Sequence, residues 1–288
     1  MGPRWRLGGL AAIDGRMVIH PVPPPLRPFV SSLWASTGEA RHPRGTTVER
    51  MLPTGSMHLV IRLDPAPLRI LEAGRRQELP FALVGGARTA PYLKEVATPV
   101  AAVGAMLRPG AAAAFFGESA DALAEKHTPL EALWGRDVER IANRLIDLPE
   151  PLARLEAFAA ELQVRLPRVR GVHPAVALAL EAIGRDVERV EELSNHAGVG
   201  PRRFGRLFRE DVGLAPKRWL RLRRFQRTLG LASRAEIDWA RAAVDLGYAD
   251  QPHLAREFRA FSGLTLGEYR RRAPWSANHV PEGAAFER

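Results

Sequence analysis

Two stretches of the sequence repeat each other: FGRLFREDVGLAPKRWL at residues 204–220 and LAREFRAFSGLTLGEYR at residues 254–270. They match at a constant offset of fifty residues, and glycines, arginines and large apolar residues recur at the same places. The matched pairs are Phe204 with Leu254, Arg206 with Arg256, Phe208 with Phe258, Gly213 with Gly263, Leu214 with Leu264 and Trp219 with Tyr269. The C-terminal part of the chain therefore contains an internal duplication.

Each copy is preceded by a shorter helical pattern and a glycine, VEELSNHAGV before the first and DWARAAVDLGY before the second. Gly198 matches Gly247 at an offset of 49, so the second turn has one additional residue. Glycine permits the left-handed backbone of a tight turn, and each unit is therefore predicted to be helix, turn, helix. The residues predicted to line the two small cores are Val190, Leu193, Ala197, Val199, Phe204, Leu207 and Phe208 in the first unit and Trp239, Ala243, Leu246, Tyr248, Leu254 and Phe258 in the second.

The second helix of such a unit is expected to present a polar face to DNA. In a helix-turn-helix this helix enters the major groove with its first residues at the base edges. Arginine can donate two hydrogen bonds to guanine, and glutamine can pair with adenine, each worth about 1–3 kcal/mol of discrimination. The predicted base-reading residues are Arg202, Arg206, Gln251, His253 and Arg256.

The starts of these two helices carry recognisable signals. Pro201 suits the first turn of a helix, and either Asp250 or Gln251 could cap the helix that contains Pro252. The choice between the two caps stays open, because the residue before a proline avoids helical angles. His253 could contact a base or phosphate, or could only stabilise the start of the helix.

Positive charge is concentrated between the two units. Residues 201–228 hold ten lysines and arginines against Glu210 and Asp211, in a chain of formal net charge +10. The stretch APKRWLRLRRFQRTLGLAS is predicted to be one helix of about 17 residues, which would span about 26 Å and separate two reading helices by nearly one DNA turn. The predicted phosphate contacts are Arg203, Lys217, Arg218, Arg221 and Arg224.

The N-terminal half has a different pattern, with short β-compatible runs broken by proline and glycine: FVSSLWAS, TTVERML, MHLVIRL, LRILEA, FALVGG and VAAVGAML. Their spacing of about ten residues predicts an antiparallel barrel or sandwich. Helices are expected at about 136–147 and 151–166, and the apolar face of the second would pack on the barrel or form a dimer seam. That face consists of Leu152, Leu155, Phe158, Leu162 and Leu166.

The duplicated segments resemble the AraC family of bacterial transcription regulators over about residues 172–273. The resemblance rests on EELSNHAGVGPRRFGRLFRE, GLAPKRWL and LGYADQPHLAREFRAFSGLTLGEYRR. It implies that Arg202, Arg206, Gln251 and Arg256 fall where family members contact bases. Two departures, Pro252 in place of a common serine and Leu266 in place of a frequent proline, put the detailed sequence preference in doubt.

The N-terminal half resembles, more weakly, a cupin-like sensor domain that precedes this module in poorly characterised regulators. The matching segments are LPTGSMHLVIRL, LVGGARTAPY and MLRPGAAAAFFG. The predicted fold class is α+β: a β-barrel-like, cupin-like domain with a helical extension, then an all-α domain of two helix-turn-helix units joined by a long linker helix. The predicted divisions are a disordered arm at 1–16, a sensor or dimerisation domain at 17–168, a DNA-binding domain at 172–273 and a disordered tail at 274–288.

Catalytic and cofactor signatures are missing from the sequence. Zero cysteines exclude disulfides, thiolate metal sites and cysteine nucleophiles. The eight histidines include no H-x-H or H-E-x-x-H pair, and neither a phosphate-binding glycine loop nor a nucleophile elbow occurs, so no metal, cofactor or catalytic residue is predicted. A metal-free isomerase stays open, and its signature would be convergent ionisable side chains inside the barrel.

Two residues are weak candidates for effector binding. His58 lies beside the LPTGSM turn on a predicted strand, where the alternative is an ordinary packed or exposed strand residue. Arg108 is the first residue of RPGAAAAFFG, where the N–H groups of a helix start could hold an anion; the alternative is a simple strand-to-helix junction.

The predicted function is sequence-specific regulation of transcription, as activator or repressor, without chemistry. The expected partners are double-stranded DNA at a promoter and, as this function would allow, RNA polymerase, a small-molecule effector and a second copy of the chain. The sequence lacks a long apolar run and a secretory signal, so we expect a cytoplasmic, nucleoid-associated protein with no membrane partner. The alternatives are a small-molecule enzyme domain fused to a DNA-binding module and a non-specific architectural DNA-binding protein.

Overall fold

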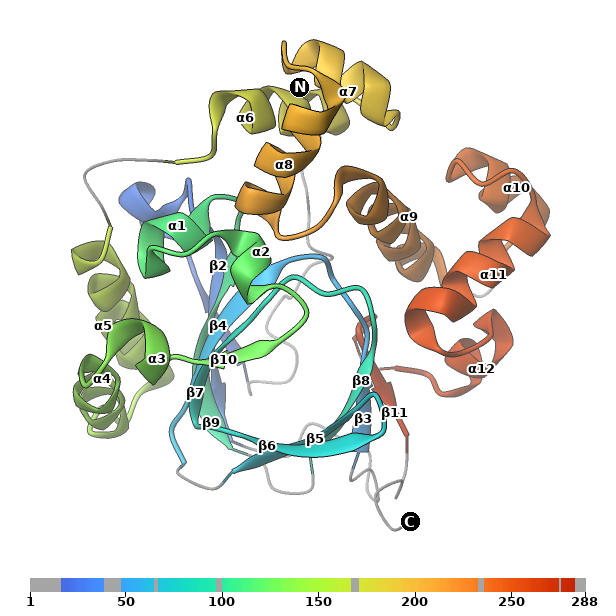
Figure 1. Cartoon of the computed structure of the whole chain (residues 1–288). Coiled ribbons are helices and arrows are strands. Elements are labelled where there is room, and N and C mark those ends of the chain that lie inside the picture. The colour runs from blue at the N-terminus through green and yellow to red at the C-terminus, as the bar shows by residue number, and fades with distance from the viewer. Residues whose placement is uncertain are drawn as a thin grey trace.

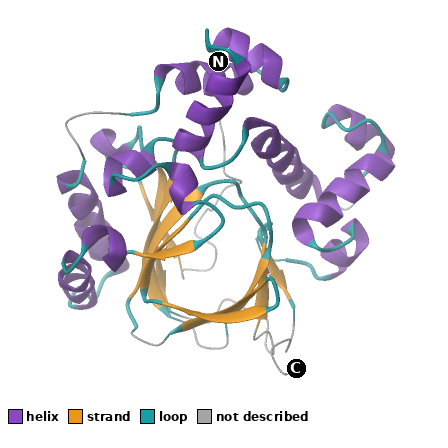
Figure 2. Cartoon of the chain, viewed as in Figure 1, coloured by secondary structure: helices purple, strands orange, loops and turns teal. Residues whose placement is uncertain are grey.

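The computed structural model describes residues 17–38, 48–64, 67–96, 100–166, 171–232, 236–274 and 276–282. Strands fill the N-terminal half and helices the C-terminal half (Figures 1 and 2), so the α+β fold class is confirmed. The predicted arm at 1–16 lies outside the described residues.

The strands form two antiparallel sheets that curve around a common interior (Figure 1). The six-stranded sheet has the order β1 (Met17–His20), β2 (Val30–Thr37), β9 (Ala101–Leu107), β4 (Met57–Arg62), β7 (Ala82–Gly85) and β10 (His127–Pro129). The five-stranded sheet has the order β11 (His279–Pro281), β3 (Val48–Met51), β8 (Tyr92–Glu95), β5 (Leu68–Glu72) and β6 (Arg75–Leu79).

Alternation along the strands gives the six-stranded sheet two different faces. Leu59 of β4 pairs in register with Ala105, and both are fully buried on the outer face. The next residue, Val60, pairs with Leu83 on the other face. Leu83 packs against Ile70 of the opposite sheet, so this second face is the interior of the barrel.

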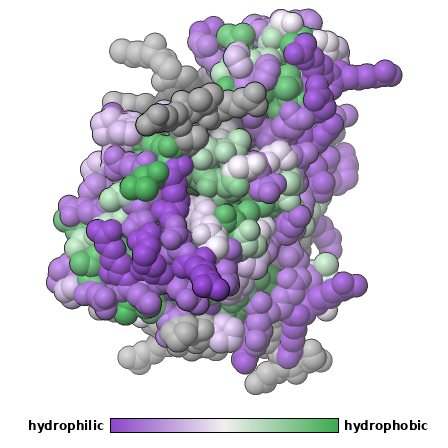
Figure 3. Space-filling model, turned by 60° about the vertical axis from the view of Figure 1, so that its left-hand side comes forward, coloured by the Kyte–Doolittle hydropathy of each residue, from purple (hydrophilic) through white to green (hydrophobic). Residues whose placement is uncertain are grey.

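A helical extension covers the outer face of the six-stranded sheet (Figure 1). It consists of α1 (Ala111–Phe116), α2 (Ala120–Leu123), α3 (Glu131–Trp134), α4 (Asp137–Ile146) and α5 (Pro151–Val164), with a short 3₁₀ turn, η1 (Pro24–Leu26), earlier in the chain. Leu155, Phe158 and Leu162 of α5 are fully buried against the sheet, whereas Leu152 is 49% exposed. The predicted apolar face therefore packs on the barrel. The surface over this side of the molecule is mainly hydrophilic, with scattered apolar spots (Figure 3).

Seven helices are described in the C-terminal part: α6 (Pro174–Gly184), α7 (Val190–His196), α8 (Pro201–Val212), α9 (Pro216–Ala232), α10 (Trp239–Asp245), α11 (Gln251–Ser262) and α12 (Leu266–Arg271). The pairs α7–α8 and α10–α11 are the two predicted units, and α9, 17 residues long, is the predicted connector. The two small cores contain the residues predicted for them, except that Phe258 belongs to the large core shared with the barrel.

The prediction of a disordered tail from residue 274 is wrong for its described part. The chain crosses back to the barrel and adds β11 to the edge of the five-stranded sheet, with Val280 fully buried. Glu282 forms ion pairs with Arg50 of β3 and with Arg272, just beyond α12. The strand is short and has one core residue, and its partner lies some 230 residues earlier, so no local pattern revealed it.

Candidate nucleic-acid interface

The turn of each helix-turn-helix unit requires glycine. Gly198 has φ +65° and Gly247 has φ +83°, both in the left-handed region that residues with a Cβ rarely adopt. The second helix of each unit also ends on a left-handed glycine, Gly213 after α8 and Gly263 after α11. The duplication seen in the sequence is thus a duplication of backbone geometry.

Helix α8 separates an apolar face from a basic one. Phe204 and Phe208 are fully buried, while the arginines of the opposite face are exposed. These are the predicted Arg202, Arg203 and Arg206, joined by Arg209, which the sequence prediction missed although it lies three residues after Arg206 on the same helix. Arg206 forms a long ion pair of 3.5 Å with Glu210 in which its side chain stays 63% exposed, so its guanidinium remains accessible.

Helix α11 presents a similar face. Gln251 and Arg256 are exposed, and Arg259 extends the polar face by one turn. Asp250 is the N-cap, and its carboxylate accepts a hydrogen bond of 2.6 Å from the backbone N–H of His253.

His253 has a structural role at the start of α11. Its Nδ1 accepts a hydrogen bond of 3.2 Å from the N–H of Ala249, and its ring lies edge-on to that of Tyr248 with the ring centroids 5.4 Å apart. The ring is half-buried rather than exposed. These contacts favour the helix-start interpretation of this residue over base reading.

The predicted phosphate contacts fall into two groups. Arg203 and Lys217 are exposed, and Arg218 is exposed with its nearest described carboxylate, Glu125, at 3.8 Å. By contrast, Arg221 and Arg224 already donate hydrogen bonds within the protein.

Arg221 forms two hydrogen bonds with Glu257 of α11, at 2.8 Å from Nε and 2.7 Å from Nη2. This pairing lowers the pKa of the Glu257 carboxyl. Arg224 donates to the carbonyl of Gly247 at 2.8 Å, in the turn of the second unit. Both arginines therefore fasten the connector α9 to the second unit.

Two family models match the chain. One, described as a helix-turn-helix domain, matches residues 193–272, and the other, described as a domain of unknown function (DUF6597), matches residues 18–129. Residues 193–272 form an AraC-type helix-turn-helix domain.

Relatives of the AraC-type domain include a transcriptional regulator. The chain is 30% identical over 161 residues to the HTH-type transcriptional regulator GlxA of Rhizobium meliloti (strain 1021). The match covers 50% of this chain and 47% of GlxA, so the chain spans about half the length of the curated relative that it matches.

Solved structures give weaker similarities. ToxT from Vibrio cholerae is 7% identical with a TM-score of 0.45, over 89% of this chain and 98% of ToxT. The C-terminal domain of AraT from Geobacillus stearothermophilus is 21% identical with a TM-score of 0.33, over 35% of this chain and 88% of that domain.

The AraC-type domain is docked on the N-terminal part at the end of α8. The carbonyl of Asp211 accepts a hydrogen bond from Gly110 at 2.9 Å, and its carboxylate accepts one from His173 N–H at 2.7 Å. Burial raises the pKa of the Asp211 carboxyl. A Cβ added to Gly213 would lie 3.2 Å from Cβ of Ala87, so the helix end approaches the barrel closely.

The structure separates the two effector candidates. Arg108 is exposed, its Nε donates to the carbonyl of Val30 at 3.3 Å, and Gly110, the N-cap of α1, gives its N–H to the AraC-type domain. Arg108 therefore lies at a strand-to-helix junction, which is the alternative interpretation given for it from the sequence. His58 lies on the interior face of the barrel, two residues before Val60.

Residues that the sequence did not single out gather around His58. Gly85 lies opposite both His58 and His127 in the sheet, and a Cβ on Gly85 would come within 2.1 Å of the His58 ring. Tyr92 of the other sheet lies edge-on to His127 with ring centroids 5.0 Å apart, and the Arg88 guanidinium lies 4.6 Å from the Tyr92 ring centre. The ionisable residues of the interior come from distant parts of the sequence, so no sequence motif predicted that they would lie together.

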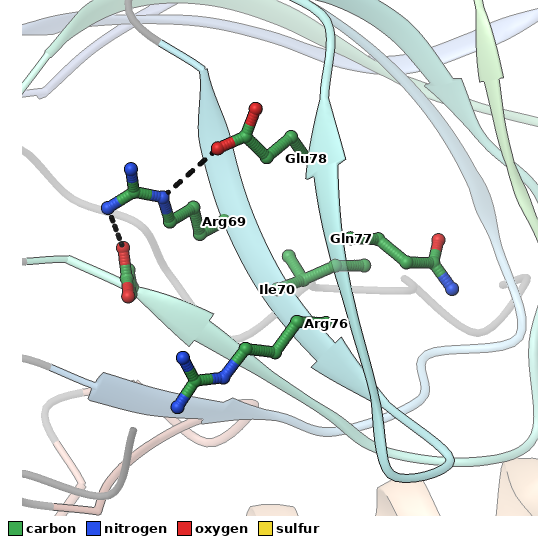
Figure 4. Close-up of a pocket in the computed structure, with 6 residues that line it drawn as sticks. Arg69, Ile70, Arg76, Gln77 and Glu78 are labelled. Atoms are coloured by element: carbon green, nitrogen blue, oxygen red, sulfur yellow. Dashed lines mark hydrogen bonds and ion pairs between the residues drawn. The ribbon is translucent and has the colours of Figure 1, made fainter. Parts of the chain in front are cut away.

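A second candidate for a small-molecule site is a shallow pocket on β5 and β6 (Figure 4). Arg69 lies between two carboxylates there, 3.2 Å from Glu78 and 3.8 Å from Glu95. The side chains of Arg69 and Glu78 are about 60% exposed, so these charges are paired and hydrated. This pocket therefore offers less to a ligand than the barrel interior.

Among the described residues, no group of three or more histidines and carboxylates is arranged to hold a metal ion. Within the same part of the chain, no helix is long and apolar enough to cross a membrane.

Proposed function

We propose that this protein is a DNA-binding transcriptional regulator that reads two successive major grooves with α8 and α11. The observation that carries the proposal is the duplicated geometry: two helices of twelve residues, each behind a glycine turn, expose arginines on the face opposite the core. Helix α9 joins them and, at about 1.5 Å per residue, is long enough to separate the reading helices by roughly one DNA turn.

Within this proposal the exposed residues at the helix starts read bases. Arg202 and Arg206 act from α8, and Gln251 and Arg256 act from α11. Arg203, Lys217 and Arg218 contact phosphates. Arg221 and Arg224 act indirectly, because they hold α9 against the second unit.

The barrel interior raises an alternative, since convergent ionisable side chains were the expected signature of an enzyme fused to a DNA-binding module. Burial lowers the pKa of His58 to about 4 and that of His127 to about 3, and raises that of Tyr92 to about 12. A general acid or base works best with a pKa near the working pH. The interior is therefore better suited to binding than to proton transfer, and we assign it to sensing without turnover.

The proposal extends to the partners of a regulator. The protein would bind promoter DNA in contact with RNA polymerase, would associate with the nucleoid and would respond to an effector at its N-terminal domain. A homodimer would place four reading helices on the DNA.

The test is selection of bound duplexes from a random pool by the full-length chain at about physiological salt, where non-specific phosphate binding is weakened. We expect a motif of two blocks about one helical turn apart. Arg206→Ala should relax the preference in one block and Arg256→Ala in the other, each with a roughly 10- to 100-fold loss of discrimination. Arg185→Ala, an exposed arginine outside both reading helices, is the matched control.

Two outcomes would contradict the proposal. Retention of both blocks by both reading-helix variants would remove α8 and α11 from the reading surface. Binding by the full chain without any preferred motif would favour an architectural protein.

A further inference from the structure

Arg88 is a buried arginine with unused hydrogen-bond donors. It is 5% exposed, and its Nη1 donates to Glu72 at 2.8 Å. Its Nε and Nη2 are also buried, and neither has a hydrogen-bond partner among the described residues. Buried donors in folded proteins are nearly always hydrogen-bonded, and leaving those of a charged group unpaired is costly, so these two nitrogens point to a missing acceptor.

The two unused nitrogens are on the same edge of the guanidinium. Nε–H and one N–H of Nη2 point in parallel, and this edge matches the two oxygens of a carboxylate. The opposite end is fixed by Glu72, and the flat face lies over the Tyr92 ring. Arg88 is thus held on two sides, and no described residue pairs with its carboxylate-binding edge.

The surroundings of this edge suit an anion with an apolar body. His127 Nδ1 is a second buried polar atom without a described partner, and the His127 ring lies edge-on to Tyr92. His58 and Tyr92 are half-buried. Beside Tyr92 lies a small apolar cluster of Ile70, Leu79 and Leu83.

We propose that Arg88, with His58, Tyr92 and His127, forms a site inside the barrel for a small organic carboxylate. The carboxylate accepts two parallel hydrogen bonds from Nε and Nη2 of Arg88, and its apolar body packs on Tyr92 and the cluster around Ile70. This assignment rests on the sensing role proposed above and specifies the class of ligand that the sensor binds.

The segment that carries Arg88 also contacts the first helix-turn-helix unit, so a ligand bound at Arg88 could change the position of that unit. Ala87 is buried where Gly213 ends α8. Thr89 donates to the carboxylate of Glu125 from its backbone N–H at 3.1 Å and from its hydroxyl at 2.7 Å. Glu125 in turn lies 3.8 Å from Arg218 of α9 and has the uncommon φ of +58°. Residues on both sides of Arg88 therefore support the α8–α9 turn.

The test uses the full-length chain without DNA and a panel of carboxylates with their uncharged amides: acetate and acetamide, hexanoate and hexanamide, benzoate and benzamide. Binding is followed by calorimetry and by the shift in melting temperature at constant ionic strength. We expect at least one carboxylate to bind saturably, at least tenfold more tightly than its amide, and inorganic phosphate to bind more weakly.

Two variants locate the site. Arg88→Lys keeps the charge beside Glu72 but removes the paired N–H edge, and should weaken carboxylate binding at least tenfold. Arg165→Lys is the matched control, because Arg165, at the end of α5 outside the barrel, is likewise paired with a glutamate, Glu161, and lies over an aromatic ring, Trp134. It should bind the carboxylate as the unmodified chain does.

A second readout does not depend on the folding of a variant. In side-chain NMR spectra of the unmodified chain, the carboxylate should shift the imidazole signals of His58 and His127 and leave the exposed His196 unchanged. Equal binding of carboxylates and amides, tighter binding of phosphate, no response to any carboxylate, or unmoved His58 and His127 signals would each overturn the proposal. Because DNA takes no part, a failure of the regulatory function would leave these results intact.

Discussion

The two helix-turn-helix units are built alike, yet their cores rest on different supports. In the first unit, Phe204 and Phe208 pack in a cluster drawn from α6 to α9 alone. In the second, Phe258 of α11 lies in the large core that also contains barrel residues such as Leu52 and Val280. The first unit has a core of its own, whereas the second shares the core of the N-terminal domain.

This difference suggests separate roles in a response to ligand. The first unit meets the N-terminal part along α8, which packs on α1 and α2, and at the end of α8 through the Gly110–Asp211 hydrogen bond and the close approach of Gly213 to Ala87. Because Phe204 and Phe208 pack in a separate cluster, this contact can change without opening the core of the first unit. The second unit shares the large core through Phe258, and the chain that follows it continues into β11 on the barrel, so its position is tied to that of the barrel. We expect the first unit to be the movable reader and the second the fixed one.

The largest effect should come from breaking the shared core. Phe258→Ala should destabilise the chain by about 3–5 kcal/mol, because it leaves a cavity among fully buried rings. Hydrogen exchange should rise in α9 and α11 and also in β3 and β11. Phe204→Ala is the matched variant in the first unit, and its increase should be confined to α6 to α8. If both variants raised hydrogen exchange in the same set of helices and strands, the two units would not have separate cores.

Acid should weaken the barrel before it weakens the helical units. His58 has a pKa near 4 in the folded chain, lowered by burial and then by Arg88, Lys94 and His279, against about 6.5 when unfolded. Between these values the unfolded chain binds more protons, so stability falls as the pH falls from 6.5 to 4, by on the order of 2–3 kcal/mol for this residue.

Urea titrations at pH 7 and pH 4.5 measure this effect. His58→Gln, which cannot take up a proton, should reduce the difference between the two pH values. His196→Gln, on the exposed surface of α7, should leave it unchanged. An unaltered pH dependence in His58→Gln would show that the ring does not resist protonation.

Features that depend on local sequence could be predicted, and features that depend on contacts between distant segments could not. The duplication predicted both units, their glycine turns and their exposed arginines, because helical spacing and turn residues are local signals. The edge strand β6, with the sequence RRQEL, has only one buried residue and so lacks the alternation of a predictable strand. Arg88, Tyr92 and His127 meet only because the two sheets face each other. Arg221 was predicted to contact phosphate because its charge was visible, but its partner Glu257 lies 36 residues away.

A smaller effect should distinguish two basic residues of α9. Arg221→Ala should lower stability by about 1–2 kcal/mol, because it removes two charge-assisted hydrogen bonds and leaves Glu257, 13% exposed, without its partner. Lys217→Ala should leave stability unchanged, because Lys217 is exposed, and should reduce the salt dependence of DNA binding by about one phosphate contact. Thermal melts and binding at several salt concentrations separate the two. If Arg221→Ala instead reduced the salt dependence and left stability unchanged, Arg221 would be a phosphate contact after all.

The smallest effect should come from the helix starts, where the units differ again. Helix α11 is capped by the Asp250 side chain, whereas α8 begins at Pro201 behind Gly200 without a side-chain cap. Asp250→Ala should therefore destabilise the second unit by about 1 kcal/mol, and Gly200→Ala should change the first by a few tenths. The loss of Asp250 should also weaken DNA binding, because Gln251, a proposed base-reading residue, lies in that first turn. If Asp250→Ala leaves both melting and binding unchanged, then the fixed position of the second reader comes from the shared core and β11 alone, and the cap adds nothing to it.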